Sequence, residues 1–204
     1  MNGLVIDASN SGLAGDMLIS ALIDLDNSNR VRETLTAIEK ELRAYDHEFS
    51  ITLNDLMNGG IKGKSISVKT VKRFHPKELY KISITVAEKI KLNHLALEFI
   101  KKTINLLTIA EATVHGVDFD KVHFHELASI DTVFDILMFA YLAMYHNLFD
   151  RTQVMIMPVA VGGGTVETAH GTLPVPAPAT AEIIKRTNLI IRGGPVEKEL
   201  LTPT

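Results

Sequence analysis

The sequence predicts an α/β protein with a mixed sheet flanked by helices, and three observations lead to this prediction. The run LVIDAS at 4–9 is short, apolar and rich in β-branched residues, which is typical of a buried strand. A glycine turn, NSGLAG, follows it and leads into DMLISALIDL at 16–25, whose apolar residues have helical spacing. The run VMIMPVAVGGG at 154–164 repeats the pattern of a strand that ends in a glycine turn. A strand, a turn and a helix form the opening of an α/β unit.

The remaining elements follow from periodicity and from the residues that end helices and strands. Helical spacing predicts helices over 31–42, 76–90, 94–116 and 131–148, with Gly116 as a C-cap and Pro178 in the first turn of a last helix. Short strands are expected at 122–126 and 189–194. The segment 49–72 alternates apolar and polar residues around NGG, with a connection longer than a tight hairpin. We expect one domain over 1–204, with 49–72 as a small β-rich insertion.

Composition and charge exclude several classes of protein. The chain has 204 residues, 46% of them apolar, and is long enough to bury a core. A net charge of −3 predicts neither a nucleic-acid partner nor a membrane partner, because both need a basic surface. No apolar run reaches 18 residues and the N-terminus lacks a basic leader, so we expect a cytoplasmic protein. Because cysteine is absent, a metal would need nitrogen and oxygen ligands from the eight histidines and the carboxylates.

The stretch KVHFHELASIDTVFD at 121–135 is the first candidate site. In a strand, His123 and His125 would project from the same face, and in the helix that follows, Asp131 and Asp135 lie one turn apart. Two imidazoles and two carboxylates would suit a divalent transition metal such as nickel, zinc or manganese. The alternative is a solvated strand face with Asp131 capping the next helix.

Two further residues favour a metal site. Glu111 and His115 are four residues apart at the end of the helix 94–116, so they share a helical face just before the histidine stretch. Two aspartates on an otherwise apolar helix also require a partner if they are buried.

The stretch GGGTVETAHG at 162–171 is the second candidate site. Consecutive glycines after a strand let backbone N–H groups turn toward an anion, which suits a phosphate. Thr165 adds a hydroxyl and His170 adds a titratable group. The alternative is a flexible loop between two strands, since the stretch lacks the lysine of a P-loop.

Two shorter stretches complete the set of candidates. In LPVPAPAT at 173–180, alternate prolines stiffen the backbone before a helix whose first amides and Thr180 could face a ligand; a plain connector is the alternative. In DASNSGLAGDM at 7–17, Asp7 follows the first strand, at the edge where open α/β sheets bind ligands. Asp16 is expected to favour the start of the next helix.

Several of these stretches together resemble the LarC family, the nickel-insertion proteins of nickel-pincer cofactor biosynthesis. DASNSGLAGDM is similar to the family's D-x-F-S-G-I-S-G-D-M, and EATVHGV with VHFHELASIDTVFDI is similar to E-A-x-V-H-G and V-H-F-H-E-V-G-A-V-D-S-I-V-D-I. GGGTVETAHGTLPVPAPAT is similar to G-x-G-x-V-x-x-A-H-G-x-L-P-V-P-A-P-A-T, and LTPT to the start of T-P-T-G. The similar stretches occur in the same order from residue 7 to residue 204.

The resemblance implies a CTP-dependent cyclometallase. Such proteins insert nickel into a pyridinium bis-thiocarboxylate mononucleotide, and so form the nickel-pincer cofactor of lactate racemase and related enzymes. CTP, with manganese or magnesium, is associated with a C-terminal domain that is absent from this chain, so a C-terminal CTP-binding domain or chain is an expected partner. A homo-oligomer is left open.

The resemblance and the chemistry of the side chains together assign expected roles. We expect nickel ligands at His115, His123, His125, Asp131 and Asp135. We expect the substrate, with its phosphate, at Gly162, Gly163, Gly164, Thr165 and Thr180. We expect catalytic roles for His170, Asp7 and Glu126, with His170 as proton donor or acceptor. The alternatives are a non-catalytic nickel- or nucleotide-binding subunit that needs a C-terminal partner, and a generic metal-dependent hydrolase.

Overall fold

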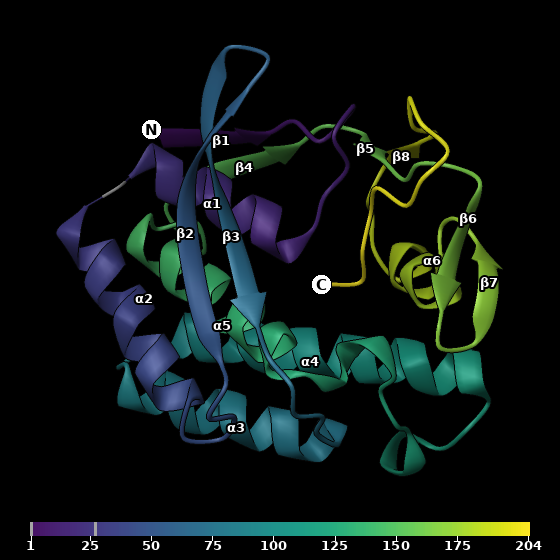
Figure 1. Cartoon of the computed structure of the whole chain (residues 1–204), viewed down its shortest axis with the longest axis horizontal. Helices are drawn as coiled ribbons and strands as arrows, with labels where there is room; N and C mark the ends of the chain where they lie inside the picture. Colours follow the sequence, from purple (N-terminus) through teal and green to yellow (C-terminus); the bar gives the residue numbers. More distant parts are fainter. Residues whose placement is uncertain (1, 27) are drawn as a thin grey trace.

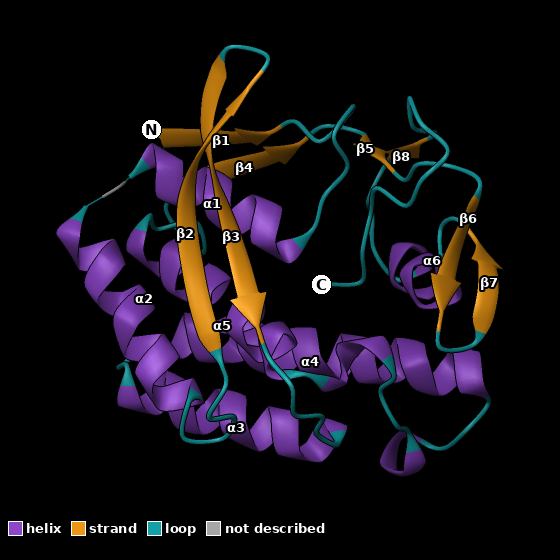
Figure 2. Cartoon of the chain, in the orientation of Figure 1, coloured by secondary structure: helices purple, strands orange, loops and turns teal. Residues whose placement is uncertain are grey.

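The α/β class is confirmed, with helices and strands interleaved along the chain (Figures 1 and 2). The computed structural model describes residues 2–26 and 28–204, without the side chains of Asn2 and Glu126. The described strands form four two-stranded sheets, two of them parallel and two antiparallel. The parallel pairs join β1 (Asn2–Ile6) to β4 (Thr152–Ile156) and β5 (Val159–Ala160) to β8 (Ile191–Arg192). The antiparallel pairs join β2 (Ser50–Asn58) to β3 (Ile61–Lys69) and β6 (Thr165–Thr168) to β7 (Gly171–Pro174).

The expected strand over 154–164 is in fact two strands, and this divides the sheet. Pro158 lies between β4 and β5 and has no backbone N–H with which to continue a ladder. The two halves therefore pair with different partners, β1 and β8. Strands of both orientations are present, as a mixed sheet requires, but they are distributed among separate pairs.

Six helices lie in the described part of the chain, and α5 is central to the main core. They are α1 (Gly15–Leu25), α2 (Asn29–Leu42), α3 (Pro76–Lys89), α4 (His94–His115), α5 (Ile130–Tyr145) and α6 (Pro178–Lys185). Most of α5 is buried, as its apolar sequence predicts. The predicted ends of two helices are confirmed: Gly116 is left-handed at the end of α4, with φ +63°, and Pro178 begins α6.

The β2–β3 hairpin is tighter than its sequence suggested. Asn58 pairs with Ile61, so only Gly59 and Gly60 form the turn, and both have positive φ (+56° and +82°). Glycine adopts such angles without strain, which allows a two-residue connection. Ile66 of β3 is buried in the main core, so this β-rich segment contributes to the same core as the helices.

The expected strand over 122–126 is wrong. Residues 122–125 are irregular and run into the 3-10 turn Glu126–Ala128, just before α5. Val122 and Phe124 are buried and His123 is exposed, so the alternation of the sequence is kept although no strand lies alongside. This segment is hydrogen-bonded to another part of the backbone at its end, before α5. There, Phe74 N–H donates to the Ala128 carbonyl (2.7 Å), and Arg73 forms an isolated β-bridge with Ser129.

The last residues of the chain return from β8 toward α1, as the yellow trace in Figure 1 shows. A second, smaller core of Ala8, Val159, Val161 and Leu201 lies along this path. Gly15 N–H, at the start of α1, donates to the Thr204 carbonyl at 3.1 Å. Within the described residues, no helix combines the length and the apolar character needed to cross a membrane.

Candidate metal centre

Three histidines from three different segments of the chain converge on one point. His115 ends α4, His125 lies in the irregular segment before α5, and His170 lies in the turn between β6 and β7. One possible ligand atom from each imidazole lies within 4.8 Å of the other two. The ring centroids are separated by 5.1 Å (His115–His125), 4.9 Å (His115–His170) and 4.3 Å (His125–His170). We call this group the three-histidine cluster.

Local bonds hold two of these histidines in place. The β6–β7 turn is closed by Thr168, whose hydroxyl accepts from His170 N–H and donates to the Gly171 carbonyl, both at 3.0 Å. Gly171 has φ +90°, which favours glycine at this point of the turn. For His125, the Arg73 guanidinium donates to its backbone carbonyl and so ties this segment to the chain that precedes α3.

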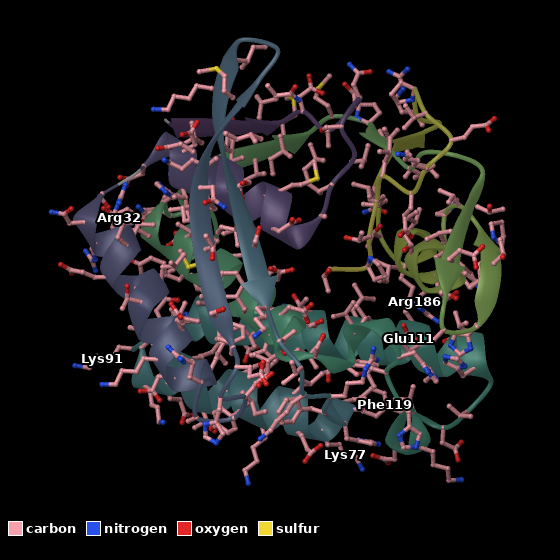
Figure 3. The ribbon with its side chains drawn as sticks, in the orientation of Figure 1. Arg32, Lys77, Lys91, Glu111, Phe119 and Arg186 are labelled. Carbon is pink, nitrogen blue, oxygen red and sulfur yellow. The ribbon has the colours of Figure 1, made fainter. Side chains whose placement is uncertain are left out.

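The end of α4, which carries His115, is joined to α6. Arg186 donates through Nη2 to the Thr113 hydroxyl at 3.0 Å, and the same nitrogen lies 3.5 Å from Oε1 of Glu182. Figure 3 labels Arg186 and Glu111 close together near this end of α4. The wall formed by α6 is thereby fixed relative to the helix that carries His115.

A cavity of about 290 Å³ lies beside the cluster. It is bounded by the end of α4, the start of α5, the β6–β7 hairpin, the start of α6 and the last residues of the chain. Five of its lining residues are carboxylic acids and two belong to the three-histidine cluster, and no described lysine or arginine lines it. These residues are Glu111, Asp131, Asp135, Glu167 and Glu199, with His115 and His170.

Asp135 has a strongly perturbed carboxyl group. Burial, together with the negative charges of Asp131 and Asp16, raises the pKa of Asp135 to about 8. Gly15 makes this position possible, because a Cβ there would lie 2.4 Å from Oδ2 of Asp135. Asp131 accepts from the Ser129 hydroxyl at 2.5 Å and from Thr132 N–H at 2.7 Å, so it stabilises the start of α5 as well as lining the cavity.

The donor set fits a divalent first-row transition metal. Imidazole nitrogen is a suitable ligand for nickel, zinc and copper, and three such ligands leave further coordination positions open to a substrate. A cavity rich in carboxylates attracts cations and lowers the cost of bringing one out of water. The arrangement can therefore bind a cation and present it to a molecule in the cavity.

The match to known proteins decides the family. The family model for nickel insertion proteins matches residues 4–204. The chain belongs to the nickel insertion protein family. It is 38% identical to a protein of Methanosphaera stadtmanae over 98% of this chain, 36% identical to one of Methanosarcina acetivorans over 95%, and 37% identical to one of Methanocaldococcus jannaschii over 95%. All three are provisionally named nickel insertion proteins.

This nickel insertion family member spans about half the length of those relatives. The matched region covers 50% of the Methanosphaera protein, 46% of the Methanosarcina protein and 48% of the Methanocaldococcus protein. No solved structure matches the chain. The similarity therefore concerns about half of each relative. The activity of a whole relative cannot be assigned to this chain from the match alone.

Among the metal ligands expected for a nickel insertion protein, the structure separates His123 from the others. His115 and His125 join the cluster, and Asp131 and Asp135 line its cavity. The ring of His123 instead packs edge-on against His75, with centroids 4.8 Å apart. The expectation that His123 and His125 share one face is wrong, because it relied on a strand that does not form.

The expected catalytic residues of this family member fare differently. His170 lies in the three-histidine cluster, where its imidazole is a candidate ligand. Asp7 is exposed and borders a different depression, and the Ser9 hydroxyl and backbone N–H donate to it and lower its pKa. The side chain of Glu126 lies outside the described residues.

The glycine run is not an open phosphate cradle. A Cβ at Gly162 would lie 1.8 Å from the Lys198 carbonyl, and Gly163 N–H donates to that carbonyl at 3.3 Å. The glycines Gly162–Gly164 thus allow the segment after β8 to pack closely. Thr165 is exposed at the start of β6 and lies outside the cavity lining.

Thr180 is buried, with 2% exposed, and does not line the cavity. Its hydroxyl makes no hydrogen bond within the described part of the structure. Its neighbours at the start of α6 do line the cavity, namely Ala177, Pro178 and Ala179.

Sequence reasoning missed several residues of this site. The sequence points to Glu111, one helical turn before His115, but assigns it no role. Glu167 and the segment Thr202–Thr204 lie in stretches that resemble the family, yet only the fold brings them and Glu199 to the same cavity.

Proposed function

We propose that the three-histidine cluster binds nickel and delivers it into an organic substrate held in the adjoining cavity. The observation that carries this proposal is the convergence of His115, His125 and His170 in a member of the nickel insertion family. Nickel is the substrate here, held by nitrogen ligands that leave coordination positions open. The carboxylates of the cavity favour entry of the cation.

The organic substrate that we propose is a pyridinium bis-thiocarboxylate mononucleotide, as the resemblance to the LarC family implies. Its ring carries positive charge, whereas its thiocarboxylates and phosphate are anionic, so the five carboxylic acids of the cavity suit the ring and the nickel ion rather than the whole molecule. Formation of a nickel–carbon bond breaks a ring C–H bond and releases one proton, while the thiocarboxylates supply the nickel–sulfur bonds. We assign proton acceptance to a cavity carboxylate, Asp135, in place of His170, because the imidazole of His170 is needed as a ligand.

The phosphate of this substrate needs a position other than the covered glycine run. The start of α6 borders the cavity through Ala177, Pro178 and Ala179. Because the N-terminus of a helix carries partial positive charge and unpaired N–H groups, it is the part of the wall that best suits an anion. CTP, with manganese or magnesium, would act in the half of the longer relatives that lies outside the matched region.

A nickel-binding subunit without catalysis is the second candidate function. It is favoured by the extent of the match, which covers only about half of each of these relatives. In that case the chain would hold nickel and act only together with a separate second half.

Calorimetry with Ni²⁺ tests the metal role. The double variant His125→Ala/His170→Ala removes two cluster ligands, so we expect nickel affinity to fall by more than about 100-fold, above the usual effect of losing an outer-sphere partner. The matched control is His123→Ala, which removes an imidazole two residues from His125 but outside the cluster. If the double variant binds Ni²⁺ with wild-type affinity, the three-histidine cluster is not the nickel site.

Product formation separates an enzyme from a carrier. The chain is incubated with the mononucleotide, Ni²⁺, CTP and Mg²⁺, with and without the second half of the Methanosphaera relative, and the nickel–carbon product is followed by mass spectrometry. Product that depends on both the second half and the three histidines supports nickel insertion. Nickel binding without product in either mixture supports the carrier.

A further inference from the structure

Glu111 is a buried carboxylate beside one of the cluster histidines. It lies on α4 one turn before His115, with 6% of its surface exposed. Its Oε2 is 3.3 Å from Nε2 of His115. Glu111 thus lies within contact distance of a cluster histidine. Glu167, which also lines the cavity, is exposed and accepts a hydrogen bond from the Thr172 hydroxyl at 2.5 Å.

The two nitrogens of an imidazole are not equivalent when one of them binds a metal. In neutral histidine one nitrogen carries the proton and the other carries the lone pair that a metal needs. The partner of the protonated nitrogen decides which tautomer is present and fixes the orientation of the ring. A buried carboxylate is a strong partner for this purpose, because the low dielectric around it strengthens the contact.

We propose that Glu111 is a positioning residue for the three-histidine cluster. Its carboxylate holds the proton of neutral His115 on Nε2 and turns the lone pair of Nδ1 toward His125 and His170. Glu111 and His115 are on the same face of one helix, so α4 alone sets this orientation, without a contribution from the other two histidines. The cluster is then prepared to receive a cation without rotation of the His115 ring.

This inference rests on the proposed function only for the identity of the metal, since the tautomer is a property of the metal-free chain. Long-range ¹H–¹⁵N correlation spectra of the wild-type chain, recorded without metal near pH 8, report which nitrogen of His115 carries the proton. We expect the Nε2–H tautomer in the wild type and a mixture of tautomers in Glu111→Gln. A wild-type Nδ1–H tautomer would overturn the proposal, and this measurement needs no variant to fold.

Metal affinity provides the second measurement. Titration with Ni²⁺ is compared for wild type, Glu111→Gln and Glu167→Gln, and the visible spectrum of bound Co²⁺ reports the coordination geometry. We expect Glu111→Gln to weaken Ni²⁺ binding by about 10–100-fold and to alter the Co²⁺ spectrum, as outer-sphere partners do. Glu167→Gln removes the same charge from the same cavity, but its carboxylate pairs with Thr172 rather than with His115, so we expect a smaller loss of Ni²⁺ affinity than in Glu111→Gln and an unaltered Co²⁺ spectrum.

The outcomes separate the two proposals. Equal losses in both glutamate variants would mean that the charge of the cavity acts generally, and Glu111 would have no positioning role. Wild-type nickel binding that depends on His125 and His170 but not on Glu111 would overturn this inference alone. A wild-type chain that binds neither metal would overturn the proposed function, while an Nε2–H tautomer of His115 lost in Glu111→Gln would still support the Glu111–His115 pairing.

Discussion

Asp46 and Asp135 are two aspartates with little contact with water and opposite pKa shifts. Asp46 has no exposed surface and accepts four hydrogen bonds, from Thr70 Oγ1 (2.8 Å) and from the backbone N–H groups of Val71 (2.8 Å), Lys72 (3.0 Å) and Glu48 (3.2 Å). Burial alone would raise its pKa, yet these donors lower the pKa of Asp46 to about 2.

Asp135 has the opposite surroundings. Burial and the negative charges of two further carboxylates, Asp131 and Asp16, together raise the pKa of Asp135 to about 8. A buried carboxylate surrounded by donors stabilises the fold, whereas one surrounded by like charge carries a cost that a bound cation would remove. The Asp46 region is therefore suited to maintaining structure, and the Asp135 cavity has the charge arrangement that a cation would stabilise.

The largest expected effect is a loss of stability on substitution of Asp46. Asp46→Ala leaves a partly buried hydroxyl and three N–H groups without their acceptor, so we expect the free energy of unfolding to fall by about 2–4 kcal/mol at pH 7. Because the folded pKa of Asp46 is lowered, its contribution is present above the unfolded pKa and is lost as pH falls from about 4 toward 2. Urea denaturation at pH 7 and pH 3 measures both effects.

Nickel binding by folded Asp46→Ala protein shows whether Asp46 affects stability alone. We expect its Ni²⁺ affinity to stay within about threefold of wild type, because Asp46 is not part of the metal cluster. A variant of wild-type stability, or one that folds but no longer binds nickel, would contradict this division of roles.

The second prediction concerns the cost carried by Asp135. Asp135→Asn keeps the shape of the side chain and removes the charge, so we expect the metal-free chain to gain about 1–3 kcal/mol of unfolding free energy at pH 8. The folded pKa of Asp135 is raised, so the folded chain is favoured below the unfolded pKa and this advantage is lost as pH rises toward about 8. The gain over wild type should therefore shrink toward pH 4.

Thermal or urea unfolding without metal across pH 4–8 measures this difference. Asp150→Asn, at an exposed position beside Arg151, serves as the charge control and should leave the pH dependence unchanged. A loss of stability in Asp135→Asn at pH 8 would show that the carboxylate is satisfied in the fold and would remove the contrast with Asp46.

The sequence predicted local structure well wherever neighbouring residues determine it. The helix that ends at Gly116 and the helix that begins at Pro178 form as expected, because glycine accepts positive φ and proline suits a first turn. The segment around His123 failed because alternation of burial does not require a strand, and a strand needs a neighbour to pair with.

The site was predictable in part for the same reason. His115, His125, Asp131 and Asp135 lie within or beside the motifs, and the spacing of the two aspartates on α5 places both at the cavity. Placing His170 in the cluster required knowledge of how the β6–β7 hairpin sits on the end of α4, which depends on α6 and on contacts such as Arg186 with Thr113. No local pattern contains that information.

The last prediction joins the two regions through the segment 70–74. Its first part bonds to Asp46, and its last part holds the segment that carries His125, through the Arg73 guanidinium on the His125 carbonyl and Phe74 N–H on the Ala128 carbonyl. We expect Arg73→Ala to weaken Ni²⁺ binding by about three- to tenfold, because His125 loses one of its restraints while the backbone bond of Phe74 remains.

The direction of the change in Ni²⁺ affinity distinguishes a positioning role of Arg73 from an electrostatic one. Removing a positive charge near a cation site should strengthen Ni²⁺ binding if electrostatics alone mattered, whereas loss of positioning weakens it. Lys72→Ala is the matched control, since it removes the same charge one residue earlier, where Nζ donates to the Tyr45 carbonyl at 3.0 Å rather than to the histidine segment. Calorimetry on both variants decides between the two. Tighter binding in Arg73→Ala would mean that the metal cluster holds its geometry without this segment, and that the Asp46 region and the nickel site are independent.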